Sequence, residues 1–275
     1  MKVSDLQTTV EKTLAKQPMV PSLTNMVTMT SVANMQIAVG GSPAMFFLAD
    51  EGEDLAATCD ALYINLGTLM SEYQETVPRT IQALEHHHKP WVLDPVGLGK
   101  GEMHRDIMAF IENHPPYIVK GNASEIITLA KTWQLVSGDS QFNGVDTHDG
   151  VDDAKVAAIK VARLTHHVVV VTGEVDLVTD GQRVIRIAGG SSWFSRVTGA
   201  GCMLGGVIAV YAGVTDPLTA ACTGVAAFNL AGEHAEEEAA GPGSFYAQFW
   251  DALYALTVKD FQHAQLTEEK VDIDD

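Results

Sequence analysis

A glycine-rich segment, Val197-Thr-Gly-Ala-Gly-Cys-Met203, contains residue types that could do chemistry at the start of a helix. Glycines let consecutive backbone N–H groups point one way, and a helix N-terminus adds about half a positive charge. The segment therefore predicts an anion hole for a phosphoryl group in transfer. The same positive end would lower the pKa of the Cys202 thiol from about 8.5, so that Cys202 could accept a proton from an alcohol. The alternative, which the residue types alone favour, is a turn above a buried cysteine.

Two carboxylates follow apolar runs that are typical of buried strands. Asp94 belongs to Leu93-Asp-Pro-Val-Gly97, and Glu125 to Lys120-Gly-Asn-Ala-Ser-Glu125. Ligands of open parallel sheets bind beyond the carboxyl ends of the strands, and Mg²⁺ takes one or two carboxylates together with phosphate oxygens and water. We therefore expect Asp94 and Glu125 near Mg²⁺. The alternatives are that Asp94 caps the next loop and that Glu125 completes a capping box with Asn122.

Further polar residues lie where they could hold a nucleotide or a small substrate. Lys120 can meet a phosphate, and Thr172 follows a strong β run and could contact nucleotide phosphate. Asn25 could bind a heteroatom of the substrate, and Met45 could offer a soft apolar wall. The alternatives are a turn at Thr172, an N-capped helix after Asn25 and a core position for Met45.

The elements that must position these residues alternate between strands and helices. The predicted strands are apolar runs: 61–65, 91–94, 117–119 and 167–172. Helical patterns separate them, and Asp180-Gly181 predicts a hairpin between 177–179 and 183–187. This alternation predicts an α/β fold, with a three-layer α-β-α arrangement around a mainly parallel sheet and an antiparallel hairpin near one edge.

Other local signals complete this outline of the chain. Residues 28–39 predict a helix closed by Gly40-Gly41, and Ser42-Pro43 predicts a turn. A polar loop is expected over 138–150, and Ser244 is expected to N-cap the last helix. We expect one domain over residues 1–275, with a loosely ordered tail from about residue 258.

Composition narrows the classes of function and the compartment. The net charge of −18 disfavours nucleic-acid binding. The three cysteines have no zinc-like spacing and are expected to be free thiols in a reducing compartment. The N-terminus lacks the apolar core of a signal peptide, and no run of about 18 uncharged apolar residues occurs, so a cytoplasmic protein is expected. The chain contains no Walker phosphate-binding loop.

Taken in order, these segments resemble hydroxyethylthiazole kinase, the thiazole-salvage enzyme of thiamine biosynthesis. The resemblance runs from about Pro18 to Leu256, and its combination of nine short stretches is specific. The matching stretches are Leu23–Val27 with Ala33-Asn34, Gly40–Pro43, Ile64–Thr68, Leu93–Gly97, Gly121–Glu125, Gly144–Asp146, Thr172–Asp176, Val197–Cys202 and Gly241–Phe245.

The resemblance implies a ribokinase-like fold and transfer of the ATP γ-phosphate to 4-methyl-5-(2-hydroxyethyl)thiazole. It also implies a homotrimer with sites at subunit interfaces. In the family, Cys202 matches the candidate base, where most ribokinase-like enzymes carry Asp. The resemblance also implies that Asp94 and Glu125 lie near Mg²⁺. It implies that Lys120 and Thr172 contact ATP, with Asn122 beside them. It implies that Met45 and Gly199 contact the thiazole, with Asn25, Gly67 and Thr68 beside them.

Two residues depart from the family pattern. Lys120 stands where the family usually has Arg, which keeps the charge but loses the bidentate fork, and Pro21 stands where it often has His. Two alternatives stay open. One is a related enzyme, either a hydroxymethylpyrimidine kinase or an ATP-dependent hydrate dehydratase, and the other is a non-catalytic ligand-binding protein on the same fold. A substrate panel with ATP distinguishes the related enzymes, and ligand binding with no ADP release would support the non-catalytic protein.

Overall fold

A computed structural model of the chain describes residues 1–136 and 150–271. Its described strands form one nine-stranded sheet in the order β2-β1-β3-β4-β5-β6-β7-β8-β9. The strands are β1 Met19–Leu23, β2 Ser42–Met45, β3 Leu62–Asn65, β4 Trp91–Asp94, β5 Ile118–Asn122, β6 Val168–Thr172, β7 Asp176–Thr179, β8 Arg183–Ala188 and β9 Gln265–Lys270.

The sheet has a parallel part and an antiparallel part. All pairings from β2 to β6 are parallel, and β6, β7, β8 and β9 pair antiparallel. The predicted hairpin around Asp180-Gly181 is the β7–β8 pair. The register sets Asn65 opposite Asp94 and Asn122 opposite Thr172, so that four polar residues lie at one edge of the sheet.

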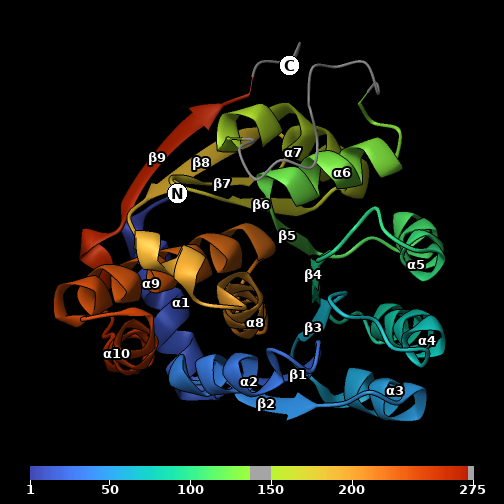
Figure 1. Cartoon of the computed structure of the whole chain (residues 1–275), viewed down its shortest axis with the longest axis horizontal. Coiled ribbons are helices and arrows are strands. Elements are labelled where there is room, and N and C mark those ends of the chain that lie inside the picture. The colour runs from blue at the N-terminus through green and yellow to red at the C-terminus, as the bar shows by residue number, and fades with distance from the viewer. Residues whose placement is uncertain (137–149, 272–275) are drawn as a thin grey trace.

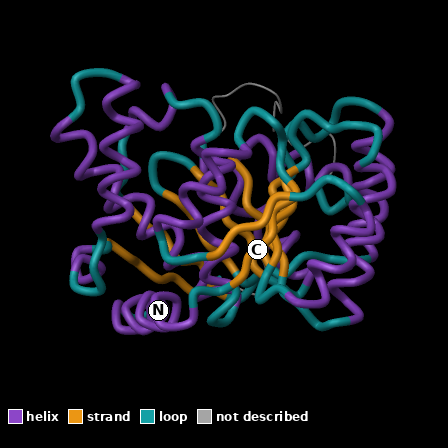
Figure 2. Tube along the Cα trace, turned by 90° about the horizontal axis from the view of Figure 1, so that it is seen from below, coloured by secondary structure: helices purple, strands orange, loops and turns teal. Residues whose placement is uncertain are grey.

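Helices cover both faces of this sheet, which confirms the predicted three-layer α/β architecture (Figures 1 and 2). One layer holds α1 Val3–Lys16, α2 Met29–Ala38, α8 Ala200–Ala212, α9 Pro217–Glu238 and α10 Pro242–Ala255. The other layer holds α3 Ala49–Thr58, α4 Tyr73–His86, α5 Glu102–Asn113, α6 Ala123–Thr132 and α7 Val151–Thr165. Strands buried on both faces read as apolar runs, as in the four consecutive valines of β6.

Small residues let α8 approach the sheet closely. A Cβ at Gly205 would lie 2.5 Å from the Tyr63 ring, and a Cβ at Gly206 would lie 2.8 Å from Val32. Both contacts are too short for a real side chain, so the glycines are required by packing rather than by φ. This close approach carries the first turn of α8, with Cys202, to the ends of the central strands.

Two strands differ from the sequence prediction. Ser42-Pro43 was expected to turn the chain, but both residues belong to the edge strand β2, where a proline is tolerated. The tail was expected to be loose from about residue 258, but its described part, to residue 271, contains a 3₁₀ turn, Asp260–His263, and the strand β9. Because β9 is an exposed, charged edge strand, it lacks the apolar run that would have predicted it.

The last helix also begins differently from the prediction. Gly241 is its N-cap, and the Ser244 hydroxyl accepts the backbone N–H groups of Ala240 and Gly241 from inside the first turn. The predicted polar loop and the Gly144-Val-Asp146 stretch lie outside the described residues, apart from Gly150. Within residues 1–136 and 150–271, no helix is long and apolar enough to span a bilayer.

Candidate active site

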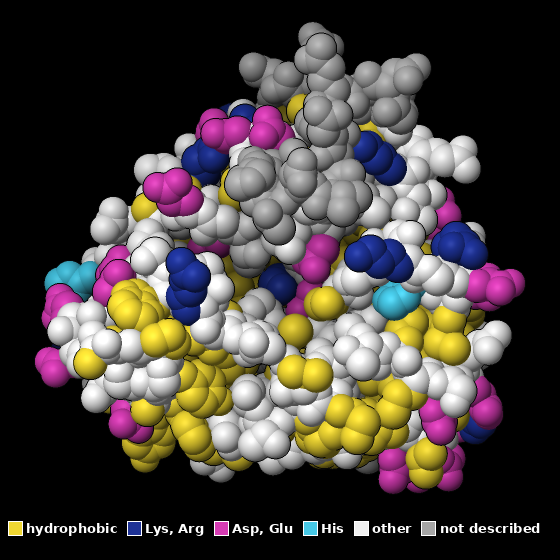
Figure 3. Space-filling model, viewed as in Figure 1, with side chains coloured by type: hydrophobic (Ala, Val, Ile, Leu, Met, Phe, Trp, Pro, Cys, Tyr) yellow, Lys and Arg dark blue, Asp and Glu magenta, His cyan; other side chains and the backbone are white. Residues whose placement is uncertain are grey.

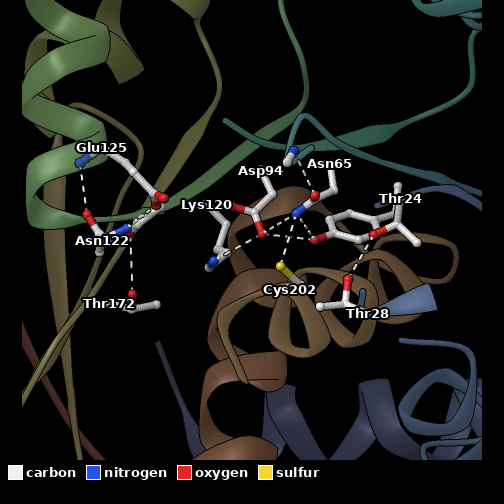
Figure 4. Close-up of polar contacts among 12 residues, drawn as sticks. Thr24, Thr28, Asn65, Asp94, Lys120, Asn122, Glu125, Thr172 and Cys202 are labelled. Carbon is white, nitrogen blue, oxygen red and sulfur yellow. Dashed lines mark hydrogen bonds and ion pairs between the residues drawn. The ribbon is translucent and has the colours of Figure 1, made fainter. Parts of the chain in front are cut away.

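Three neighbouring strands bring a buried ionic cluster together at their carboxyl ends (Figure 4). Oδ2 of Asp94 accepts hydrogen bonds from Tyr63 Oη at 2.9 Å, Asn65 Nδ2 at 3.1 Å and Lys120 Nζ at 3.2 Å. The Asp94 side chain is fully buried and that of Lys120 is 3% exposed. Oδ1 of Asp94 is buried and accepts no hydrogen bond from any described residue. A buried carboxylate oxygen without a partner is a site that a ligand could satisfy.

Asn65 links this cluster to Cys202. Its Nδ2 lies 3.3 Å from Cys202 Sγ, and its Oδ1 accepts from Asn25 Nδ2 at 2.9 Å and from the Gly67 backbone N–H at 3.0 Å. Asn25 Nδ2 also lies 3.8 Å from Cys202 Sγ. Sequence reasoning did not single out Asn65. A polar residue ending an apolar strand was the available signal, and it is the signal that identified Asp94.

The glycine-rich start of α8 closes the cluster from the other side. Gly199 precedes the helix with φ of +81°, and a Cβ there would lie 2.3 Å from Cγ2 of Thr28. A Cβ at Gly201 would lie 2.9 Å from Lys120 Nζ. The helix N-terminus, the Lys120 ammonium and the Cys202 thiol therefore lie together, and two positive groups converge where a phosphoryl group could be held.

The cluster shifts the proton affinities of its own members. Burial alone would lower the pKa of Lys120, but the charges of Asp94 and Glu125 more than offset this and raise the pKa. Burial, followed by the charge of Asp94, raises the pKa of the Cys202 thiol. The predicted lowering of this pKa is therefore wrong, because burial and the nearby Asp94 carboxylate raise it.

A second polar group lies on the neighbouring strand ends. Asn122 Oδ1 accepts the Glu125 backbone N–H at 2.9 Å, and Glu125 Oε2 accepts the Asn122 backbone N–H at 2.9 Å. This capping box begins α6, as the sequence alternative held. Thr172 Oγ1 donates to the Gly121 carbonyl at 3.4 Å. Burial and the charge of Asp94 raise the pKa of Glu125, so the two carboxylates repel each other across the site.

The two carboxylates fit a hard divalent cation. One buried oxygen of Asp94 has no partner among the described residues, and the mutual repulsion of Asp94 and Glu125 is the kind that a cation relieves. Across the described ranges, no three side chains of His, Cys, Asp or Glu gather as a ready metal cage. Mg²⁺ suits such a site, because it keeps several waters and binds through one or two carboxylates and substrate phosphates.

The residues expected to contact the small substrate lie along the parallel part of the sheet. Gly67 is buried, and a Cβ there would crowd Asn65 Oδ1 at 3.0 Å. Thr68 is exposed and has φ of +49°. Met45 is half-buried at the end of β2, opposite Ser22. Figure 3 shows this face of the molecule hollowed near its middle, with acidic and basic side chains visible in the hollow.

His104 was also missed by sequence reasoning. Its Nε2 lies 2.9 Å from the Leu66 carbonyl and 3.3 Å from the Val96 carbonyl. One imidazole on α5 therefore ties the loop after β3 to the loop after β4. The contact with Val96 spans 8 positions, but the one with Leu66 spans 38, and nothing in the local sequence around His104 identifies it.

The chain is similar to known proteins over most of its length. Residues 10–259 match the model of the hydroxyethylthiazole kinase family. A curated relative, hydroxyethylthiazole kinase of Bifidobacterium longum, is 40% identical over 269 residues, which covers 90% of this chain and 86% of the relative.

Solved structures extend the comparison to the fold. Hydroxyethylthiazole kinase from Pyrococcus horikoshii OT3 superposes with a TM-score of 0.87 at 31% identity, covering 97% of this chain and 99% of that one. Pyridoxal kinase from Staphylococcus aureus, in complex with AMP-PCP and pyridoxal, gives a TM-score of 0.63 at 15% identity over 93% of this chain and 100% of that one. The second likeness shows the fold alone. The fold is ribokinase-like, as expected, and the chain belongs to the hydroxyethylthiazole kinase family.

Proposed function

We propose that this protein transfers the γ-phosphate of ATP to the hydroxyl of 4-methyl-5-(2-hydroxyethyl)thiazole in thiamine salvage. The observation that carries this proposal is the convergence of Asp94, Lys120 and Cys202 at the start of α8, where no described residue bonds to Oδ1 of Asp94. The names of the Bifidobacterium longum and Pyrococcus horikoshii relatives support the substrate. The complex of the Staphylococcus aureus kinase with AMP-PCP supports a nucleotide donor.

The nucleotide phosphates would lie across the ends of β5 and β6. Asn122 and Thr172 are opposite each other in the register of these strands, and Lys120 precedes them on β5. The Lys120 ammonium beside Gly201 would attract phosphate oxygens without the bidentate geometry of an arginine. We propose these three residues as the ATP contacts.

Asp94 and Glu125 would hold Mg²⁺ together with phosphate oxygens and water. When bound, the ion neutralises charge on the phosphates during transfer. Asp94 would offer its unpartnered Oδ1, because its Oδ2 already accepts three hydrogen bonds. The hydrogen bonds from Tyr63 and Asn65 keep the carboxylate plane fixed for this role.

The thiazole alcohol would lie near Asn25, Met45, Gly67, Thr68 and Gly199, with its hydroxyl toward Cys202. The bond from the alcohol oxygen to γ-phosphorus forms as the bridging bond to ADP breaks, and the alcohol proton is released to solvent. Catalysis then rests on position and on charge stabilisation by Lys120 and the α8 amides. Because the pKa of Cys202 is raised, the thiol assists as a hydrogen-bond partner of the alcohol rather than as an indispensable base.

We also propose that three copies assemble with their sites at the interfaces. Met26 and Val27, in the loop that follows Asn25, are both 66% exposed, and Ile37 and Leu48 are 55% and 51% exposed. Burial of such side chains favours association. Sedimentation should give a mass of about three chains, and a monomer with full activity would contradict the assembly.

Two further proposals concern the chain as a whole. We propose that it works as a single domain, because the described strands all belong to one sheet. We propose a cytoplasmic setting, because Cys59, Cys202 and Cys222 are buried free thiols, which suit a reducing compartment.

The test is ADP release by the full chain with ATP, the thiazole alcohol and Mg²⁺. We expect turnover that needs all three, with little turnover on hydroxymethylpyrimidine or pyridoxal. Turnover on hydroxymethylpyrimidine instead would move the protein to that activity. Tight binding of the thiazole alcohol without any ADP release would support the non-catalytic alternative and overturn the proposal.

A further inference from the structure

The loop between β6 and β7 is held by Asp176, the first residue of β7. Oδ1 of Asp176 accepts the backbone N–H of Gly173 at 3.0 Å, which closes residues 173–176 into a compact turn. A Cβ at Gly173 would lie 2.2 Å from Val151 Cγ2, so the turn is also pressed against the first residue of α7. The loop therefore has little freedom on the side of the α7 layer.

The same aspartate is held from the opposite layer. Oδ2 of Asp176 accepts a hydrogen bond from Asn229 Nδ2 at 2.9 Å. Asn229 lies in the middle of α9, and both side chains are buried, with 6% exposure for Asp176 and 8% for Asn229. A buried polar pair of this kind must be mutually satisfied, so it fixes the position of each member.

A second loop packs against Asn229. Gly189 and Gly190 follow β8 with φ of +117° and +88°, in the region that favours glycine. A Cβ at Gly190 would lie 3.0 Å from Asn229 Oδ1, and a Cβ at Gly189 would lie 2.5 Å from Glu233 Oε1, one helical turn further along α9. The loop after β8 thus lies directly on Asn229, the α9 residue that bonds to Asp176, and on Glu233.

Both loops lie at the edge of the sheet that carries the proposed ATP contacts. β6 ends at Thr172, and β8 runs in the same direction as β6 because each pairs antiparallel with β7. Thr172 in turn bonds to the Gly121 carbonyl, next to Asn122. The Asp176–Asn229 pair is therefore connected to the proposed nucleotide contacts by a short, hydrogen-bonded path.

We propose that Asp176 and Asn229 are positioning residues for nucleotide binding, which hold the loops after β6 and β8 in the shape that receives ATP. The inference rests on the proposed function for its nucleotide. It assigns the pair to the nucleotide end of the site and not to the proposed thiazole end near Asn25 and Gly67, which follow the parallel strands β1 and β3.

The test compares ADP binding and steady-state kinetics in the full chain. In Asn229→Ala, loss of one buried hydrogen bond should weaken ADP binding and raise KM for ATP by about 10-fold. The KM for the thiazole alcohol and kcat at saturating ATP should stay within about 3-fold of wild type, a split that simple destabilisation does not produce. Asn113→Ala, on the exposed face of α5, is the matched control.

An exchange variant tests the geometry directly. In Asp176→Asn combined with Asn229→Asp, the amide at 176 can still accept from Gly173 and can donate to the carboxylate at 229. This variant should bind ADP within about 3-fold of wild type, since both hydrogen bonds are retained. It also keeps the inference open to disproof if Asn229→Ala fails to fold.

The outcomes separate this inference from the proposed function. ADP binding by wild type without thiazole phosphorylation would defeat the substrate assignment and leave the nucleotide inference standing. Wild type that binds no ADP would overturn both. Unchanged ADP binding in Asn229→Ala, equal losses for ADP and thiazole alcohol, or a folded exchange variant with weak ADP binding would each overturn the inference alone.

Discussion

Asp94 and Asp176 are both buried aspartates at the same edge of the sheet, and their partners differ. Asp94 pairs with the Lys120 ammonium and keeps one oxygen without a partner among the described residues. Asp176 bonds through both oxygens to neutral N–H groups of Gly173 and Asn229. The first arrangement is incomplete until a ligand arrives, whereas the second is complete by itself. Buried carboxylates at the same edge of the sheet can therefore either take part in the reaction or hold the fold in place. A carboxylate oxygen without a hydrogen-bond partner distinguishes the first kind from the second.

The largest expected loss of activity follows Asp94→Asn, which changes the carboxylate that has an oxygen without a described partner. We expect kcat to fall by about 100-fold or more, since charge-stabilising groups contribute that much. The buried Lys120 would also lose its ion-pair partner, which destabilises a fold by about 3–5 kcal/mol. Coupled ADP release and urea unfolding measure the two effects.

A double variant separates these effects. Asp94→Asn with Lys120→Met removes both charges, so most of the stability should return while activity stays low. If Asp94→Asn alone kept more than about a tenth of wild-type kcat, the assignment of Asp94 to the reaction would fail.

Asn65→Ala is expected to have the next largest effect. It removes the hydrogen bonds that orient Asp94 and Cys202, and loss of such supporting contacts lowers activity by about 10–100-fold. The loss should appear in kcat more than in either KM. Asn113→Ala serves as the matched amide control, and equal kinetics for the two variants would remove Asn65 from the mechanism.

A smaller effect is expected for Cys202→Ala. Because burial raises the pKa of the thiol, little thiolate is present at neutral pH, and we expect kcat to fall only about 10-fold. Cys59→Ala controls for the removal of a buried thiol elsewhere in the chain. A loss of about 1,000-fold would make Cys202 the principal base, and full turnover would deny it any part.

The smallest expected effect on turnover comes from Asp176→Asn. This variant tests the role of Asp176 through the pH dependence of stability. Burial raises the pKa of Asp176 to about 6, against about 3.9 in unfolded chains. Between about pH 3.9 and pH 6, Asp176 is therefore protonated in the native state and ionised in the unfolded state. The aspartate's contribution to stability is full below about pH 4 and is lost as pH rises through 6, by roughly 3 kcal/mol.

The asparagine cannot titrate, so the difference in unfolding free energy should move in favour of the variant as pH rises from 4 to 7. Urea unfolding of both proteins across this range measures the difference. A difference in unfolding free energy that does not change with pH would mean that burial does not raise the pKa of Asp176 in the native state.

Sequence reasoning succeeded where one strand or one helix end decides the outcome. The apolar run ending at Asp94 and the capping signal from Asn122 to Glu125 are local, and both are present in the structure. Sequence reasoning failed where the outcome depends on how deeply a side chain is buried, or on a contact with a residue far away in the sequence. The pKa of Cys202 was predicted in the wrong direction because the sequence does not give burial. The contact of Asp176 with Asn229 joins residues 53 positions apart, which no spacing rule connects.

β9 is the last described strand to be synthesised, and it covers β8 with six residue pairs. Until Gln265–Lys270 has left the ribosome, β8 presents an open ladder of backbone groups flanked by Val184, Ile185 and Ile187. An unfinished chain would thus expose β8 as an unpaired edge strand, which the charged β9 later covers. A chain that ends before Gln265 should therefore aggregate, even though it contains every proposed site residue.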